Sequence, residues 1–130
     1  MSSVFTKIIN RELPAFVVAE DRDHISFLDI NPIAYGHVLV VPKQEVNYVF
    51  DIDEHQYMQF FNFAKKVAIA MKKAITCQRI GVSVIGIEVP HAHIHLIPLN
   101  TISDINFEKE KLSITSVKLK EIAEKIKKFI

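Results

Sequence analysis

The stretch His91-Ala92-His93-Ile94-His95-Leu96-Ile97-Pro98 is the most informative part of this chain. Successive side chains of an extended strand point to opposite faces, so residues two apart lie on one face about 6.5 to 7 Å from each other. We therefore expect a strand over residues 91–97 that presents three imidazoles on one side. Its alternate residues, Ala92, Ile94 and Leu96, would face the core and anchor the strand. Such an arrangement predicts a rigid site.

Two other interpretations of these histidines stay open. They could be ordinary strand residues, although three histidines in register on one face would be a rare accident. A zinc or copper site is the stronger rival, because two histidines two residues apart on a strand can chelate one metal. However, the third histidine lies too far along the strand to share an ion with the first. The single Cys77 also excludes a sulfur-rich zinc site. We expect neither a metal nor a cofactor.

The composition indicates a compact, soluble protein. The chain has 130 residues, of which 49% are hydrophobic and only 3 are glycine, a size and composition typical of a single folded domain. A formal net charge of +1 does not favour nucleic acid as a partner. No stretch reaches the roughly 20 apolar residues of a membrane span, and the N-terminus lacks the apolar core of a signal peptide. With one cysteine, we expect a protein of the reducing cytoplasm.

The order of hydrophobic patterns predicts an α+β fold. Short β-like runs at 16–19, 25–29 and 37–41 precede a helix over 53–76, for which Asp51 or Asp53 is the N-cap. A strand at 80–85, a turn at 86–90 and the histidine strand follow, and a second helix ends the chain. We expect an antiparallel meander of about five strands, with the histidine strand central and both helices packed on the sheet. The long helix carries more apolar surface than one sheet covers, which favours a homodimer.

The chain resembles the histidine triad (HIT) family of nucleotide hydrolases and transferases. The family signature, His-φ-His-φ-His-φ-φ with φ apolar, is matched by residues 91–97 without exception. Further segments follow in the family's order: 4–9, 13–15, 20–21, 27–32 and 36–43. The resemblance covers about residues 4–98 and implies a single HIT-like domain over 1–130, in which 103–130 form a C-terminal helical extension.

The resemblance also implies roles for individual residues. His93 would be the nucleophile that attacks the α-phosphorus, and His91 would lie near the leaving group. His37 and His95 would contact phosphate oxygens, and Asp29 would accept hydrogen bonds from the ribose. Each of these residues also has a simpler interpretation, because Asp29 could be a turn residue and the apolar ones ordinary core. The side chains expected to enclose the base are Phe5, Ile8, Phe27 and Leu39. His24 and His55 lie outside the family segments, and we expect both to be exposed and not catalytic.

The chain departs from the family pattern before the triad. Ser83 stands where the family has asparagine, Ile87 replaces a glutamine, and Glu88 replaces the hydroxyl residue that assists the leaving group. A carboxylate beside a phosphate is repulsive unless it faces a cation, so Glu88 suggests a preference for amine leaving groups. Glu45 occupies a position where the family often has histidine.

The resemblance implies a homodimeric hydrolase of purine nucleoside phosphoramidates or related nucleotides, acting through a nucleotidyl-histidine intermediate. One alternative is a dinucleoside polyphosphate hydrolase, although Leu99-Asn100-Thr101 lacks the arginine of that branch. Another is a nucleotide-binding regulator with little turnover. In each case the partner is a purine nucleotide, and neither nucleic acid nor a membrane is expected.

Overall fold

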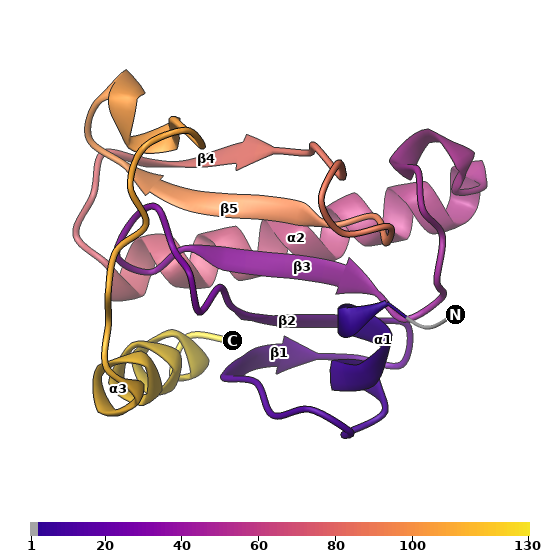
Figure 1. Cartoon of the computed structure of the whole chain (residues 1–130), viewed down its shortest axis with the longest axis horizontal. Helices are drawn as coiled ribbons and strands as arrows, with labels where there is room; N and C mark the ends of the chain where they lie inside the picture. Colours follow the sequence, from indigo (N-terminus) through magenta and orange to yellow (C-terminus); the bar gives the residue numbers. More distant parts are fainter. Residues whose placement is uncertain (1–2) are drawn as a thin grey trace.

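A computed structural model gives the structure of the protein and describes residues 3–130. Within these residues, five strands form one antiparallel sheet in the order β1-β2-β3-β5-β4, and three α-helices accompany it. This arrangement confirms the expected α+β class (Figure 1). The strands are β1 (Val17–Glu20), β2 (His24–Leu28), β3 (Val38–Pro42), β4 (Arg79–Ser83) and β5 (Ile94–Leu99), and the helices are α1 (Val4–Ile9), α2 (Glu54–Ala74) and α3 (Ser116–Lys127), with 3-10 turns η1 (Val49–Asp51) and η2 (Ile102–Ile105).

The topology places the histidine strand inside the sheet. Strands β1 to β3 form a meander, and α2 then carries the chain behind the sheet to β4 at the far edge (Figure 1). Strand β5 returns between β4 and β3 and pairs antiparallel with both. The expected interior position of β5 is confirmed, whereas the meander is interrupted after its third strand.

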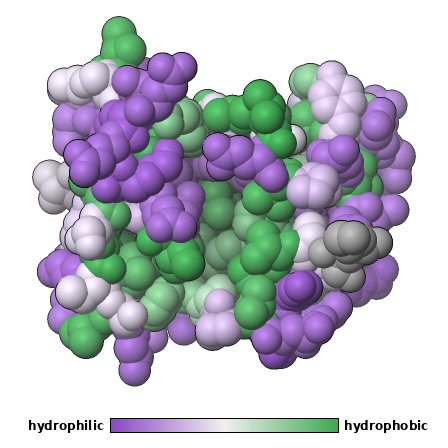
Figure 2. Space-filling model, viewed as in Figure 1, coloured by the Kyte–Doolittle hydropathy of each residue, from purple (hydrophilic) through white to green (hydrophobic). Residues whose placement is uncertain are grey.

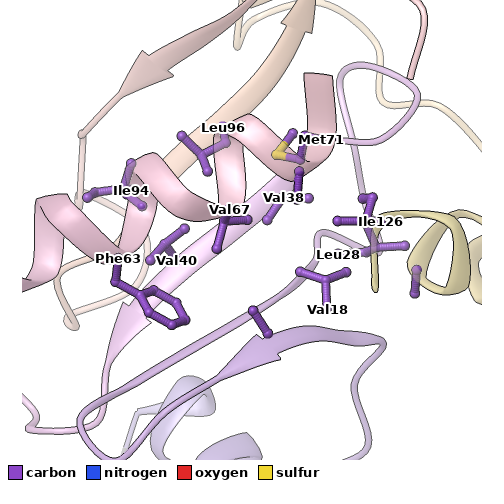
Figure 3. Close-up of a cluster of buried hydrophobic side chains, with 14 of the residues drawn as sticks. Val18, Leu28, Val38, Val40, Phe63, Val67, Met71, Ile94, Leu96 and Ile126 are labelled. Atoms are coloured by element: carbon purple, nitrogen blue, oxygen red, sulfur yellow. The ribbon is translucent and has the colours of Figure 1, made fainter. Parts of the chain in front are cut away.

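Helix α2 covers one face of the sheet and forms the main core with it. Its N-cap is Asp53, whose carboxylate accepts a hydrogen bond from the N–H of Gln56 at 3.0 Å, so the second of the two expected caps is the correct one. Neither α2 nor any other helix in residues 3–130 is long and apolar enough to cross a membrane. Figure 3 shows the core side chains of α2 turned toward those of the strands and α3: Phe63, Val67 and Met71 against Val38, Val40, Ile94, Leu96 and Ile126.

Two local features differ from the expectation. The histidine strand was expected over 91–97, but β5 begins only at Ile94 and ends at Leu99. The physical reason is that the preceding N–H groups leave the ladder, because His91 N–H donates to the carbonyl of Val89 and Ala92 N–H to that of Val46. Helix α1, which the patterns did not predict, lies on the sheet face opposite α2.

A buried hydroxyl on the core side of β2 yields a testable prediction. Ser26 is 0% exposed, and its Oγ has no hydrogen-bond partner among the described residues. A buried polar group without a partner costs about 1–3 kcal/mol. We therefore expect Ser26→Ala to raise the free energy of unfolding by about 1 kcal/mol, measured by urea denaturation. A loss of stability would mean that the hydroxyl does have a partner.

Candidate functional site

The strand register brings the predicted site residues into one row on the face opposite α2. His95 lies opposite Ser83 on one side and Leu39 on the other, and Leu39 lies opposite Phe27. Figure 2 shows this face, with a largely apolar hollow across its middle. The row therefore joins four strands on the face that carries this hollow.

The hydrogen bond of His93 defines which of its nitrogens is free. His93 Nδ1 lies 2.7 Å from the carbonyl oxygen of His91. A carbonyl can only accept, so Nδ1 carries the proton and donates it. The neutral ring then keeps the lone pair on Nε2, for which the described residues provide no partner. A nucleophilic imidazole needs such a free nitrogen, and the role of His93 as the nucleophile stays a prediction.

His37 and His95 form a directed chain of hydrogen bonds. The N–H of Ile33 donates to His37 Nδ1 at 3.2 Å, which places the His37 proton on Nε2. His37 Nε2 lies 2.9 Å from His95 Nδ1 and donates to it. His95 must then carry its own proton on Nε2. The ring centroids of His93 and His95 are 4.9 Å apart, so His95 carries this donor beside the His93 ring.

His91 occupies a different environment from the other three histidines. It is 0% exposed, and both of its nitrogens are engaged within the protein. Nε2 donates to the carbonyl of Pro42 at 2.8 Å, so Nδ1 accepts from the hydroxyl of Ser3, also at 2.8 Å. Contact with a leaving group needs an accessible nitrogen, which His91 lacks in this structure. The expected role of His91 beside the leaving group therefore stays a prediction.

The apolar residues expected around the base form one cluster beside His93. Phe5 packs edge-on against Phe27, with ring centroids 5.6 Å apart, and against His93 at 4.9 Å. Leu39 belongs to the same buried cluster, and Ile8 packs against it. The structure thus brings the four residues together next to His93, and their role in enclosing the base stays a prediction.

Asp29 lies at the edge of this site, just after β2. Its Oδ1 accepts a hydrogen bond from the N–H of Asn31 at 2.8 Å, which is the turn role considered from the sequence. Its Oδ2 lies 3.7 Å from His37 Nε2. Burial raises the pKa of Asp29, and the bond from Asn31 partly opposes this effect. The turn therefore holds the carboxylate close to the histidines, and the turn role is compatible with ribose binding.

Burial keeps the histidines neutral. Burial, helped by the positive charge of Lys111, lowers the pKa of His37 to about 4. Burial is also the main cause that lowers the pKa of His95 to about 3, followed by the charges of His93, His37 and Lys111. Burial also lowers the pKa of His93, against the opposing effects of the His91 carbonyl and the charge of Asp29. An imidazole acts as a nucleophile only in its neutral form, so the electrostatics suit the proposed chemistry.

These pKa values predict that the protein loses stability in weak acid. In the unfolded chain His37 titrates near its ordinary value of 6.5, whereas in the fold it stays neutral down to about 4. Between these values the unfolded state binds more protons, so stability falls as the pH is lowered through this window. We expect urea denaturation to show this loss, with a smaller slope against pH in His37→Gln. The exposed His55→Gln is the control, and equal slopes in both variants would contradict the assignment.

The segment between η2 and α3 supplies two residues that sequence reasoning missed. The ring of Phe107 packs edge-on against His95, with centroids 4.7 Å apart, and lies 6.1 Å from that of His37. Lys111 donates to the carbonyl of Phe107 at 3.1 Å, and the N–H of Leu112 donates to that of Pro32 at 2.8 Å. This segment has no periodic pattern, so its sequence offers no signal that it reaches the histidines.

The remaining candidates have mixed outcomes. His55 is exposed, as expected, but His24 is buried, which corrects the expectation for that residue. Its ring stacks on Phe63 of α2 with centroids 5.1 Å apart, and its Nδ1 lies 3.0 Å from Asp21 Oδ1. This α2-facing position keeps His24 out of the site. Glu88 is exposed, and its charge acts to raise the pKa of Asp29.

A metal site is the rival interpretation of part of this cluster. Ligand atoms of Asp29, His37 and His95 all lie within 4.8 Å of one another. However, the N–H of Ile33 occupies His37 Nδ1, so the proton of a neutral His37 is on Nε2, the nitrogen nearest the other two groups. A metal would have to displace that proton and disturb the bond to Ile33. The hydrogen-bonded chain is therefore the better account of this geometry.

Comparison with known proteins gives consistent matches. The HIT domain family model matches residues 10–102. An uncharacterized HIT-like protein of Borreliella burgdorferi is 34% identical over 131 residues, which cover 95% of this chain and 94% of that protein. The adenosine 5'-monophosphoramidase HNT1 of Saccharomyces cerevisiae is 38% identical over 97 residues, 73% of this chain and 61% of the yeast protein. The crystal structure of a Hit-like protein from Bartonella henselae has a TM-score of 0.86 at 31% identity and covers 99% of this chain and 96% of its own.

Proposed function

The chain belongs to the HIT domain family, and from this membership and the site geometry we propose that it hydrolyses purine nucleoside phosphoramidates through a nucleotidyl-histidine intermediate. The observation that carries the proposal is the hydrogen bond from His93 Nδ1 to the His91 carbonyl, which leaves Nε2 free. Similarity to the phosphoramidases of two yeasts, at 38% and 32% identity, supports the substrate class.

The proposed reaction has two steps. In the first, His93 Nε2 attacks the α-phosphorus, the bond from phosphorus to the leaving amine breaks, and the amine takes up a proton from solvent. In the second, water attacks the same phosphorus and gives up a proton to solvent, the bond to His93 breaks, and the nucleoside monophosphate is released. His95 Nε2–H would donate to a phosphate oxygen as negative charge develops there. The His91 carbonyl and the charge of Asp29 would stabilise the cationic ring of the intermediate.

The test is direct. The protein is incubated with adenosine 5'-phosphoramidate, and the release of AMP is followed over time. Samples quenched without acid are analysed for a covalent nucleotidyl adduct on the protein. We expect multiple turnovers and a transient adduct on His93, identified by mass spectrometry. Nucleotide binding without AMP release would favour the regulator instead.

The position of Lys111 favours a second candidate function, that of a dinucleoside polyphosphate hydrolase. Its ammonium donates to the carbonyl of Phe107, whose ring packs near His37 and His95, and its charge lowers the pKa of both histidines. A cation there would attract a leaving group that carries phosphates, whereas Glu88 would attract an amine. Comparing kcat/KM for a diadenosine polyphosphate and for the phosphoramidate decides between the two.

A homodimer is the state that we propose for the active protein. Strand β4 forms an open edge of the described sheet, with Val82 55% exposed, and α2 exposes Met58 and Ile69. Such an edge beside apolar helix residues is suited to pairing with a second copy. Sedimentation equilibrium of the wild type and of Val82→Lys tests this, because a charge on β4 would weaken the pair. The expected cytoplasmic location stays a prediction.

A further inference from the structure

Glu45 has no part in the reaction described above, yet it makes two short hydrogen bonds to the start of α1. A single oxygen, Oε1, accepts from the backbone N–H of Ser3 at 2.7 Å and from the hydroxyl of Thr6 at 2.6 Å. Glu45 follows β3 in the chain, whereas both donors belong to the N-cap and first turn of α1. These contacts fasten α1 to the end of β3, and we call the three residues the α1 clasp.

Ser3 connects the α1 clasp to the first histidine of the triad. Its Oγ caps α1 by accepting from the N–H of Thr6 at 3.0 Å, and it donates to His91 Nδ1 at 2.8 Å. The opposite nitrogen of His91 donates to the carbonyl of Pro42. The His91 ring is therefore held between the start of α1 and the end of β3, with its two ends on the two elements that Glu45 joins.

Two contacts connect this arrangement with the nucleophile. The backbone carbonyl of His91 accepts the proton of His93 Nδ1 at 2.7 Å. Phe5, in the first turn of α1, packs against both rings, with centroids 5.9 Å from His91 and 4.9 Å from His93. A shift of α1 would therefore move the carbonyl that orients His93 and also the ring that packs on it.

We propose that Glu45 is a positioning residue for the nucleophile, which it orients by clasping α1 against His91. The inference rests on the proposed function, since it assigns Glu45 a role in the rate of that reaction. Glu45 acts through hydrogen-bond geometry and not through its charge, because both hydrogen bonds go to one oxygen with two lone pairs. Glutamine offers the same carbonyl oxygen without the charge. A neutral imidazole, the group that the resemblance led us to expect at this position, has only one acceptor nitrogen and cannot accept both bonds.

The experiment compares four variants in the full chain: Glu45→Ala, Glu45→Gln, Thr6→Val and the control Glu12→Ala. Glu12 is an exposed glutamate close to α1, and its side chain makes no hydrogen bond within residues 3–130. For each we measure kcat per folded molecule with adenosine 5'-phosphoramidate, the melting temperature, and the 15N chemical shifts of the His91 and His93 rings. Glu45→Ala is expected to lower kcat roughly tenfold, the scale of a small misplacement of a reacting group. It should also move both sets of ring shifts.

The other variants separate the causes. Glu45→Gln should keep kcat within about threefold of wild type and leave the ring shifts in place, since its amide oxygen can accept both bonds. Thr6→Val removes one donor and should give an intermediate loss. If Glu45→Ala only lowered the melting temperature, or if glutamine were as damaging as alanine, the proposal would be overturned. A wild type without turnover would refute the proposed function, and the ring shifts alone would then decide whether the clasp orients His93.

Discussion

Replacing His93 by alanine is expected to reduce turnover of a nucleoside phosphoramidate by at least about 10⁴-fold, because in the proposed reaction His93 forms the bond to phosphorus. In the proposed reaction the free Nε2 of His93 is the nucleophile, and the neighbouring His95 presents a proton on its own Nε2. The covalent adduct should disappear together with the turnover. Rapid-quench kinetics and intact-protein mass spectrometry measure both effects.

Two measurements accompany the His93 variant. AMP binding by calorimetry should survive, because Phe5 and Phe27 also pack against each other, and Leu39 belongs to the same buried cluster. His55→Ala changes an exposed histidine and should keep full activity. If His93→Ala retained a tenth of the wild-type rate, the nucleophile would have to be sought elsewhere.

The second large effect concerns stability. Phe60 on α2 is 0% exposed and packs with the buried His24, with ring centroids 6.0 Å apart and planes 7° apart. Truncating a buried phenylalanine to alanine costs about 3–5 kcal/mol, because contacts are lost and a cavity remains. A domain has only about 5–15 kcal/mol in total, so we expect Phe60→Ala to unfold at a much lower urea concentration and to be partly unfolded at 37 °C.

Phe50 provides the matched control for this substitution. It is 68% exposed, and Phe50→Ala should change the free energy of unfolding by less than about 1 kcal/mol. Phe60→Leu should recover much of the loss, because leucine fills more of the space. Equal effects at positions 50 and 60 would show that α2 is not the centre of the core.

The fold and the row of site residues were predictable because strand alternation records which side of the sheet is buried. Ile94 and Leu96 are buried against α2, while His95 lies on the opposite face beside Leu39. The same parity placed Phe27 in that row. Family resemblance then assigned chemistry to positions that alternation alone describes only as buried.

The parts that escaped prediction depend on contacts between distant segments. Burial of His24 results from stacking on α2, and the two engaged nitrogens of His91 depend on Ser3 and Pro42. Phe107 reaches His95 from a segment without regular structure. Local patterns encode neither loop paths nor the partners of a buried polar atom, so these features needed the three-dimensional structure.

The proton on His93 Nδ1 is held by a main-chain carbonyl, which limits how substitutions can affect this hydrogen bond. Every amino acid has a backbone carbonyl, so no amino-acid substitution at position 91 can remove the acceptor for His93 Nδ1. Mutational drift there can alter where the oxygen sits but cannot remove it. A side-chain acceptor, such as the aspartate of a serine protease triad, can be lost by substitution, whereas the acceptor that fixes the tautomer of His93 cannot.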